Sequence, residues 1–287
     1  MSIKNFIKPA AGVLASGALA LSLVACGGAS GASSSSSSSG TSTASDNVIT
    51  VGASPSPHAE ILNAVADELK AEGYELKVVE YNDYVQPNVA LSEGDLDANY
   101  FQHAPYLENY NEENGTDLVS AYAIHFEPMG IYAGKSSDIK NVPDGAQIAV
   151  PSDATNEARA LLLLQDQGVI TLKDGVGLEA TANDIESNPH NIQLVEVEAA
   201  AVARSLEDVD FAIINGNYAL SAGLDTSATL ASEDADSEAA QTYANIVAVR
   251  KGDEDNEKTQ ALIKALTSQT AKDFIESEYK GSVIPVF

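Results

Sequence analysis

Short apolar stretches alternate with amphipathic stretches from about residue 46 to the C-terminus. Residues 48–53 (Val-Ile-Thr-Val-Gly-Ala) form an apolar run that predicts a buried strand. A helix is predicted to begin near Ser56 and Pro57, because serine is a good N-cap and proline suits the first helical position. Gly73 predicts the end of this helix.

The same succession of strand and helix continues along the chain. Further strands are expected at 75–81, 96–101, 120–133, 147–150, 192–197, 211–214 and 245–250, and further helices at 87–92, 105–114, 156–167, 256–268 and 270–279. This alternation is typical of an α/β protein with mostly parallel sheets, which bind ligands beyond the carboxyl ends of their strands.

The first 45 residues have a different pattern. Lys4 and Lys8 precede an apolar stretch over 10–25, which is typical of an export signal. This stretch leads into the sequence Leu-Val-Ala-Cys at residues 23–26, which resembles the lipobox of bacterial lipoproteins. We therefore expect residues 1–25 to be removed and Cys26 to carry the lipid, although an ordinary signal peptide with an incidental cysteine is an alternative. Residues 27–45 are rich in serine and glycine and uncharged, so they predict a flexible tether.

Composition and charge narrow the function. The 287 residues contain 15 Lys+Arg and 42 Asp+Glu, and the net charge of -27 disfavours nucleic acid as a partner. The single cysteine excludes a disulfide framework and a cysteine-ligated metal site within the chain. The four histidines show no i, i+3 or i, i+4 pairing, so we expect neither a metal site nor a cofactor.

Several segments carry a resemblance to a known family. They read Val51-Gly-Ala-Ser-Pro55, Asn82-Asp-Tyr-Val-Gln-Pro-Asn88, Asp97-Ala-Asn-Tyr-Phe-Gln-His103, Pro151-Ser-Asp-Ala-Thr-Asn156 with Arg159, and Tyr243-Ala-Asn245. In order and spacing they resemble the methionine-binding lipoprotein (NlpA/MetQ) family over essentially 46–287.

This resemblance implies a two-lobed periplasmic-binding-protein fold, type II-like, with the ligand in the cleft between the lobes. We expect one lobe to comprise 46–128 plus 244–287 and the other 129–243, with a hinge near Met129 and Tyr243. The resemblance also implies delivery of methionine to the permease and ATPase complex of an ABC importer. The protein would stay on the outer side of the cell membrane through the lipid on Cys26.

The polar residues of these segments suit a zwitterionic ligand. Arg159 is one of only three arginines, and no acid lies three or four positions away on its helix, which weakens its interpretation as a solvated surface arginine. Its position in the family motif implies that it binds a carboxylate in a bidentate manner. By resemblance, Asn156, Asn215 and Asn245 match polar binding positions, although asparagine at a helix start can also act only as a cap. Whether Asn215 or Asn217 faces the cleft stays open.

Aromatic residues are expected to form the slot for the side chain of the ligand. Tyr84, Phe101, His103 and Tyr106 are assigned to connections between strands and helices and match the aromatic pocket of the family. His103 would serve as a wall or a hydrogen-bond donor. His58 and His125 are expected either to line the cleft or to hold the hinge.

The sequence also bears on three alternatives: an enzyme, a different ligand and a surface adhesin. The chain has neither a Gly-x-Ser-x-Gly motif nor a glycine-rich phosphate loop with lysine, so we expect no enzyme. Acid pairs such as Asp225 with Glu233 are interpreted as solvated surface. The ligand could be L-methionine, D-methionine, a methionine-containing dipeptide or another amino acid. A surface adhesin would explain the tether and the charge but not the cleft motifs.

Overall fold

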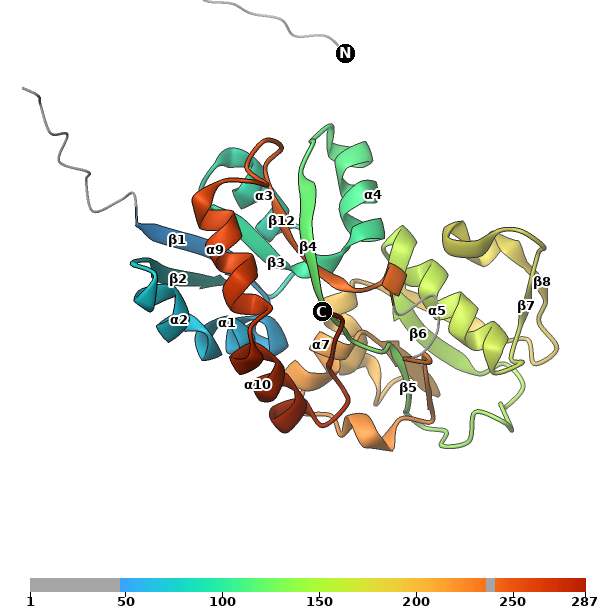
Figure 1. Ribbon diagram of the computed structural model, residues 1–287. Coiled ribbons are helices and arrows are strands. Elements are labelled where there is room, and N and C mark those ends of the chain that lie inside the picture. The colour runs from blue at the N-terminus through green and yellow to red at the C-terminus, as the bar shows by residue number, and fades with distance from the viewer. Residues whose placement is uncertain (1–46, 236–240) are drawn as a thin grey trace, which may run out of the picture. The chain divides into compact units, whose positions relative to one another are not determined.

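A computed structural model describes residues 47–235 and 241–287 of the chain (Figure 1). The predicted signal segment, Cys26 and the predicted tether lie outside these described residues. Within them, no helix is both long and apolar enough to span a bilayer.

The first sheet combines strands from both ends of the described chain. Its order is β13-β4-β12-β3-β1-β2, where β1 is Val48–Ala53, β2 Glu75–Glu80, β3 Ala98–His103, β4 Val119–Phe126, β12 Asn245–Val249 and β13 Ile284–Pro285. β1 pairs in parallel with β2 and β3, whereas β12 and β13 pair in antiparallel orientation. The sheet is therefore mixed, and the expectation of mostly parallel sheets is wrong.

Helices cover both faces of this sheet. On one face, η1 (Pro55–Ala59), α1 (Glu60–Ala64), α2 (Ala66–Ala71), α9 (Glu257–Leu266) and α10 (Gln269–Tyr279) contribute to a core with Ile49, Val51 and Val247. On the other face, α3 (Gln86–Glu93) and α4 (Ala104–Asn114) pack with Phe101 and Ile246.

The helix that we expected over 56–73 is broken. Ser56 has extended backbone angles, and Val65 separates α1 from α2 with φ -103° and ψ 5°. The apolar positions Ile61, Leu62 and Leu69 still lie in the core, because a short interruption keeps both pieces on the same face of the sheet.

The second sheet lies in the middle of the sequence. Its order is β11-β5-β10-β6-β9, where β5 is Gly130–Ala133, β6 Gln147–Pro151, β9 Gln193–Val197, β10 Phe211–Ile214 and β11 Ala231–Ser232. β6 is parallel to β9 and β10, whereas β5 is antiparallel to β10 and β11. The sheet packs with α5 (Ala154–Asp166) on one face and with α6 (Ala199–Val202) and α7 (Gly216–Ser221) on the other.

The remaining described elements are short. They are β7 (Thr171–Leu172) and β8 (Ile185–Ser187), which pair as a two-stranded sheet, and the turns of 3-10 helix η2 (Gly177–Glu179), η3 (Ala182–Asp184), η4 (Ala203–Ser205) and η5 (Thr226–Ala228).

The chain passes from the first sheet to the second between β4 and β5. We expected one extended segment over 120–133, but residues 127–129 separate two strands that belong to different sheets. Pro128 lies at this break, where its missing N–H cannot take part in a strand ladder. The chain returns to the first sheet at β12, so two connections join the two halves of an α/β fold (Figure 1).

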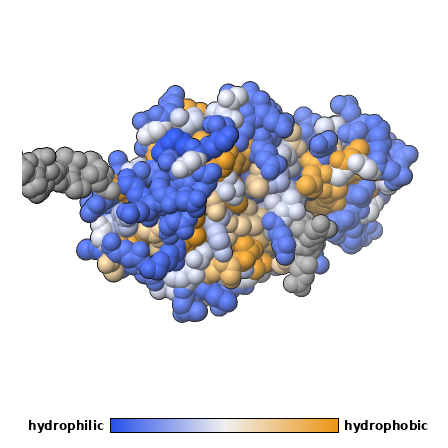
Figure 2. Space-filling model, turned by 45° about the horizontal axis from the view of Figure 1, so that its top comes forward, coloured by the Kyte–Doolittle hydropathy of each residue, from blue (hydrophilic) through white to orange (hydrophobic). Residues whose placement is uncertain are grey.

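The surface of the described chain is largely hydrophilic on the face shown in Figure 2, with small apolar areas between the polar ones. Few large apolar side chains are exposed among the described residues, and Val85 is the most exposed of them at 50%. This surface agrees with the strong excess of acidic residues in the sequence.

Candidate functional site

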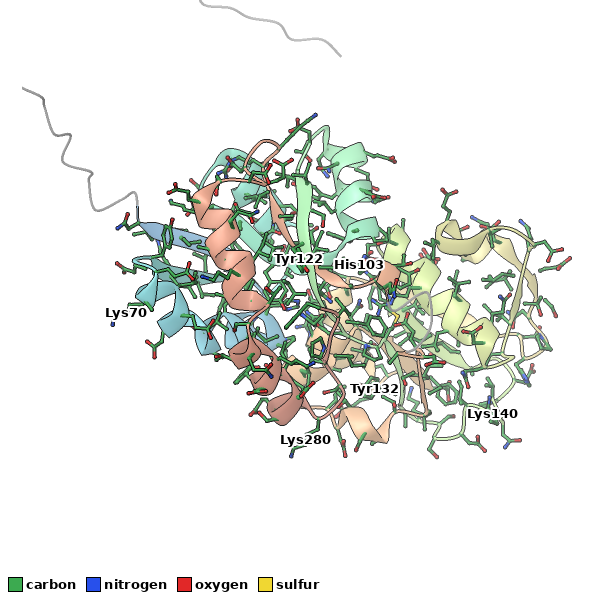
Figure 3. The ribbon with its side chains drawn as sticks, in the orientation of Figure 1. Lys70, His103, Tyr122, Tyr132, Lys140 and Lys280 are labelled. Atoms are coloured by element: carbon green, nitrogen blue, oxygen red, sulfur yellow. The ribbon has the colours of Figure 1, made fainter. Side chains whose placement is uncertain are left out.

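A cavity lies between the two sheets. About 320 Å³ of space lies between the residues that line it, and this volume includes the solvent-filled space at its open mouth. Every ligand-binding residue that we expected from the sequence lines this one cavity: Tyr84, Phe101, His103, Tyr106, Asn156, Arg159, Asn215 and Asn245. Figure 3 labels His103, which ends β3 of the first sheet and whose Nε2 lies 3.2 Å from Oδ1 of Asn156 at the start of α5. The fold thus brings together residues that are far apart in sequence.

Arg159 is held inside the protein by a carboxylate. Its Nε and Nη2 donate to the two carboxylate oxygens of Glu233 at 2.5 and 2.6 Å, and Glu233 also accepts from the backbone N–H of Met129. The two side chains are 4% and 9% exposed, so the interpretation of Glu233 as solvated surface is wrong. Because Glu233 occupies the guanidinium edge formed by Nε and Nη2, the structure contradicts a bidentate grip of that edge on a ligand. Nη1 has no hydrogen-bond partner among the described residues.

Arg159 also contacts both connections between the sheets. Its Nη2 donates to the carbonyl oxygen of Glu127 at 2.8 Å, and its guanidinium carbon lies 4.6 Å from the ring centre of Tyr243 and 5.7 Å from that of Phe126. Burial acts to lower the pKa of Arg159, but the charge and hydrogen bonds of Glu233 outweigh it and the pKa is raised. The arginine therefore stays charged at the place where the two halves meet.

The side chains at the starts of α5 and α7 are linked by hydrogen bonds. Asp153 caps α5 by accepting from the backbone N–H of Asn156 at 3.0 Å, and it also accepts from Nδ2 of Asn156 at 2.8 Å. Oδ1 of Asn156 accepts from Nδ2 of Asn215 at 2.8 Å and lies 3.2 Å from Nε2 of His103. Nδ1 of His103 accepts from the backbone N–H of Tyr106, so the proton of this imidazole lies on Nε2.

Burial keeps His103 neutral. Together with the nearby charge of Arg159, it lowers the pKa of His103 to about 3. At neutral pH His103 is therefore a hydrogen-bond donor to Oδ1 of Asn156, and its expected role towards a ligand stays a prediction.

Two amide atoms in this cavity lack partners. Oδ1 of Asn215 and Nδ2 of Asn217 are buried and have no hydrogen-bond partner within the described part of the chain. Oδ1 of Asn217 accepts from the hydroxyl of Tyr84 at 2.6 Å. Both asparagines therefore line the cavity, and each has one polar atom available to a ligand.

Aromatic rings form one wall of the cavity. Tyr84 has its ring centre 5.7 Å from Phe101, 5.6 Å from Tyr106 and 4.9 Å from Tyr218. Of the residues expected in connections, only Tyr84 lies in one, between β2 and α3; Phe101 and His103 are in β3 and Tyr106 is in α4. Tyr218 follows Asn217 on α7, does not itself line the cavity and was not predicted, because a helix of six residues is too short to show a hydrophobic period.

A second buried group lies behind the cavity. Nε2 of His125 lies 2.6 Å and Nε2 of His58 lies 3.4 Å from Oε1 of Glu127, and nitrogen and oxygen atoms of the three side chains lie within 4.8 Å of one another. Neither histidine lines the cavity, whereas Glu127 does. Such a set could hold a metal ion, which the sequence spacing did not indicate, but His125 already hydrogen-bonds to Glu127 and His58 to Asn245.

Three residues that line the cavity, Gln102, Glu127 and Gly216, were not expected from the sequence. Asn217, the open alternative to Asn215, lines the cavity as well. Position 216 requires glycine, because a Cβ atom there would lie 2.7 Å from Cβ of Glu127. This close approach lets the backbone N–H of Asn217 hydrogen-bond to the carboxyl group of Glu127. The apolar strand 211–214 followed by Asn-Gly-Asn was the available signal for this site.

Comparisons with known proteins extend over the same part of the chain. The family model described as NlpA lipoprotein matches residues 49–287. The "Methionine-binding lipoprotein MetQ" of Bacillus subtilis (strain 168) is 43% identical over 243 residues, which cover 83% of this chain and 88% of the relative. The "D-methionine-binding lipoprotein MetQ" of Salmonella typhimurium is 39% identical over 239 residues, which cover 82% of this chain and 86% of that protein.

A solved structure agrees with the fold. A nutrient-binding protein from Burkholderia cenocepacia, bound to methionine, superimposes with a TM-score of 0.79 at 45% sequence identity, covering 83% of this chain and all of the other. The match shares the mixed α/β architecture with two lobes. From the family model and these relatives, the chain belongs to the NlpA lipoprotein family.

Proposed function

We propose that this protein binds methionine in the cavity between its two lobes and delivers it to the permease and ATPase complex of an ABC importer. The names of the relatives support this ligand, and one similar structure contains methionine. The cavity gives independent support, because its polar atoms match the two ends of an amino acid.

The observation that best supports the proposal is that the cavity offers both unpaired hydrogen-bond donors and an unpaired acceptor. Arg159 offers the N–H groups of Nη1, whereas Asn215 offers an unpaired acceptor oxygen. A carboxylate needs donors and an ammonium group needs acceptors. We assign the ligand carboxylate to Arg159 and Asn245 and the ammonium group to Asn215.

The side chain of methionine would lie against the aromatic wall. Tyr84, Phe101 and Tyr106 offer ring faces and edges, with which a thioether sulfur makes favourable contacts. We expect substitution of Phe101 by alanine to reduce selectivity for methionine over shorter side chains more than it reduces affinity for the zwitterion.

We propose that 46–128 plus 244–287 form one lobe and 129–243 the other, with the hinge near Met129 and Tyr243. The order of strands supports this division, since each of the two large sheets falls within one of the two proposed lobes.

We also propose that Cys26 carries a lipid that holds the protein on the outer side of the cell membrane. A Cys26→Ser variant should then leave the membrane fraction, and finding it still there would contradict the anchor.

A binding role without catalysis fits the residues at the site. The described residues that line the cavity include no serine, threonine, cysteine or lysine, so they offer none of these usual nucleophiles. The relatives are named as binding proteins.

The experiment that tests the function is a thermal-unfolding assay with a panel of ligands. The panel contains L-methionine, D-methionine, a methionine-containing dipeptide and other amino acids. Ligand at one hundred times its Kd stabilises a protein by about 2.7 kcal/mol, which corresponds to roughly 5–10 °C for a chain of this size. A shift with one methionine isomer supports the proposal, a shift only with the dipeptide favours that ligand, and no shift with any member contradicts it.

A further inference from the structure

Two sets of buried hydrogen bonds lie behind the cavity, and each set ends on a residue that lines it, Glu127 or Asn245. The hydroxyl of Tyr100 contacts Nδ1 of His125, Nε2 of His125 contacts Oε1 of Glu127 at 2.6 Å, and Nε2 of His58 lies 3.0 Å from Oδ1 of Asn245. Tyr100, His58 and His125 are 0% exposed. Solvent therefore cannot satisfy or reorient these groups.

The neighbours of His58 determine where its proton lies. Nε2 faces Oδ1 of Asn245 and, at 3.4 Å, Oε1 of Glu127. A carboxylate oxygen only accepts hydrogen bonds, so Nε2 must carry the proton if both contacts are to be favourable. Nδ1 of His58 has no partner among the described residues, which suits a bare nitrogen better than a buried N–H group.

The charge state of His58 agrees with this geometry. Burial lowers the pKa of His58 to about 4, although the charge of Glu127 acts in the opposite direction. The imidazole is neutral at neutral pH and holds one proton, on Nε2.

The reversed orientation of the Asn245 amide is disfavoured by the same neighbours. If Nδ2 of Asn245 faced His58, Nε2 of the imidazole would have to accept that hydrogen bond, and the imidazole proton would lie on Nδ1. The lone pair of Nε2 would then face the oxygen of Glu127, and the buried N–H group at Nδ1 would have no partner among the described residues. The observed orientation uses Oδ1 of Asn245 for His58 and leaves Nδ2 without a partner among the described residues.

We propose that His58 is a positioning residue, which holds Asn245 with its Nδ2 group towards the cavity and so favours a carboxylate over a neutral carboxamide in the ligand. This inference rests on the proposed binding of an amino acid. It assigns a role to a side chain that does not line the cavity. A free Asn245 amide could rotate and accept from a carboxamide, whereas an amide held by His58 can only donate to the ligand.

The competing interpretation of this cluster is a metal site. His58, His125 and Glu127 could supply three ligand atoms. A metal ion would have to replace the protons on both Nε2 atoms, and it would leave Oδ1 of Asn245 without its donor. The hydrogen bonds that all three side chains make favour the positioning role.

The first test compares L-methionine with L-methioninamide by calorimetric titration. In the unsubstituted protein the amide should bind more weakly. His58→Leu should lower the ratio of the two Kd values about 5-fold, because Asn245 can then rotate. His58→Gln retains a donor near the position of Nε2 and should restore the ratio to within 2-fold.

A matched control separates positioning from stability. Tyr279→Phe removes a hydroxyl that lies 3.4 Å from the carbonyl oxygen of Pro57, next to His58, and outside the chain of contacts to Asn245. It should lower the melting temperature and leave the Kd ratio unchanged. An unchanged ratio in folded His58→Leu would overturn the proposal.

The second test needs neither a variant nor a ligand. Spectra of ¹⁵N-labelled protein that correlate the imidazole nitrogens with their ring protons identify the tautomer of each histidine. We expect His58 to be neutral with its proton on Nε2, with and without added Zn²⁺. A proton on Nδ1, or loss of the Nε2 proton with Zn²⁺, would overturn the inference even if His58→Leu does not fold. Because this result does not depend on methionine, its failure is distinguishable from failure of the proposed function.

Discussion

For Arg159, the sequence predicted a residue away from the surface but not the partner that holds its side chain. The lack of an acid three or four residues away argued against a surface arginine, and Arg159 is indeed buried, whereas its role in ligand binding stays a prediction. Its partner Glu233 lies 74 residues further along the chain, and sequence spacing carries no information about such a contact. The same limit applies to His58 and Asn245, which are 187 residues apart.

We expect Arg159→Ala and Asn245→Ala each to weaken methionine binding by roughly 30-fold or more. Loss of a charged hydrogen bond in a closed site typically costs about 2–5 kcal/mol, whereas an exposed arginine contributes less than about 1 kcal/mol. Calorimetric titration measures the Kd values, and exposed Arg204→Ala is the control. If both variants bind methionine as tightly as the unsubstituted protein, the assignment of the carboxylate end is wrong.

Acidification should destabilise the fold through the buried histidines. Burial lowers the pKa of His58 to about 4 and that of His103 and His125 to about 3, so these groups take up protons on unfolding once the pH falls below about 6.5. Their stabilising contribution is complete above that pH and is lost as the pH falls towards 4. The raised pKa of Glu127, also caused mainly by burial, opposes the trend in part.

The free energy of unfolding should therefore drop by roughly 2–5 kcal/mol between pH 7 and pH 5. Urea denaturation at a series of pH values measures it, and His103→Gln should reduce the slope because it removes one of the buried neutral imidazoles. A flat stability profile over this range would contradict the buried neutral state.

At the scale of elements, the sequence predicted long and strongly patterned segments well. The expected strand 48–53 coincides with β1, and the expected helix 105–114 agrees with α4 within one residue. Glycine in the left-handed conformation ends α3 at Gly94 and α4 at Gly115, as its turn chemistry predicts.

Short elements escaped prediction for a physical reason. β11 has two residues and α7 has six, too few to show a hydrophobic period. Their positions are fixed by pairing and packing with distant segments, such as the pairing of β11 with β5. Two of the five side-chain amides that line the cavity, those of Asn215 and Asn217, are placed by α7, so the sequence could not decide between them.

The start of α5 couples helix stability to the site. Asp153 caps the helix and holds the side-chain amide of Asn156. We expect Asp153→Ala to lose about 1 kcal/mol of stability from the missing cap and also to weaken methionine binding several-fold.

Asn256→Ala is the matched control, because Asn256 caps α9 through the backbone N–H of Thr259 and does not line the cavity. It should cost similar stability in urea denaturation and leave the Kd unchanged. Equal affinity in both variants would show that Asp153 acts only as a cap.

At the scale of the whole molecule, contacts across the cavity join the two halves of the described chain. The hydroxyl of Tyr84 donates to Asn217, and that of Tyr218 lies 3.4 Å from the carbonyl oxygen of Asn82. In the described chain two connections link the sheets, and Leu220 of α7 also packs against the core of the first half. We expect these contacts to separate when the two lobes open. Small-angle scattering of the Cys26→Ser protein should show a smaller radius of gyration with methionine than without it. Unchanged scattering at saturating methionine would contradict closure.

The most direct test of the central claim is a crystal structure of the protein with methionine. We expect one methionine in the cavity, with its carboxylate at Nη1 of Arg159 and Nδ2 of Asn245, its ammonium group at Oδ1 of Asn215 and its sulfur among Tyr84, Phe101 and Tyr106. Methionine bound elsewhere on the protein, or bound in this cavity with its two charged ends exchanged, would contradict it.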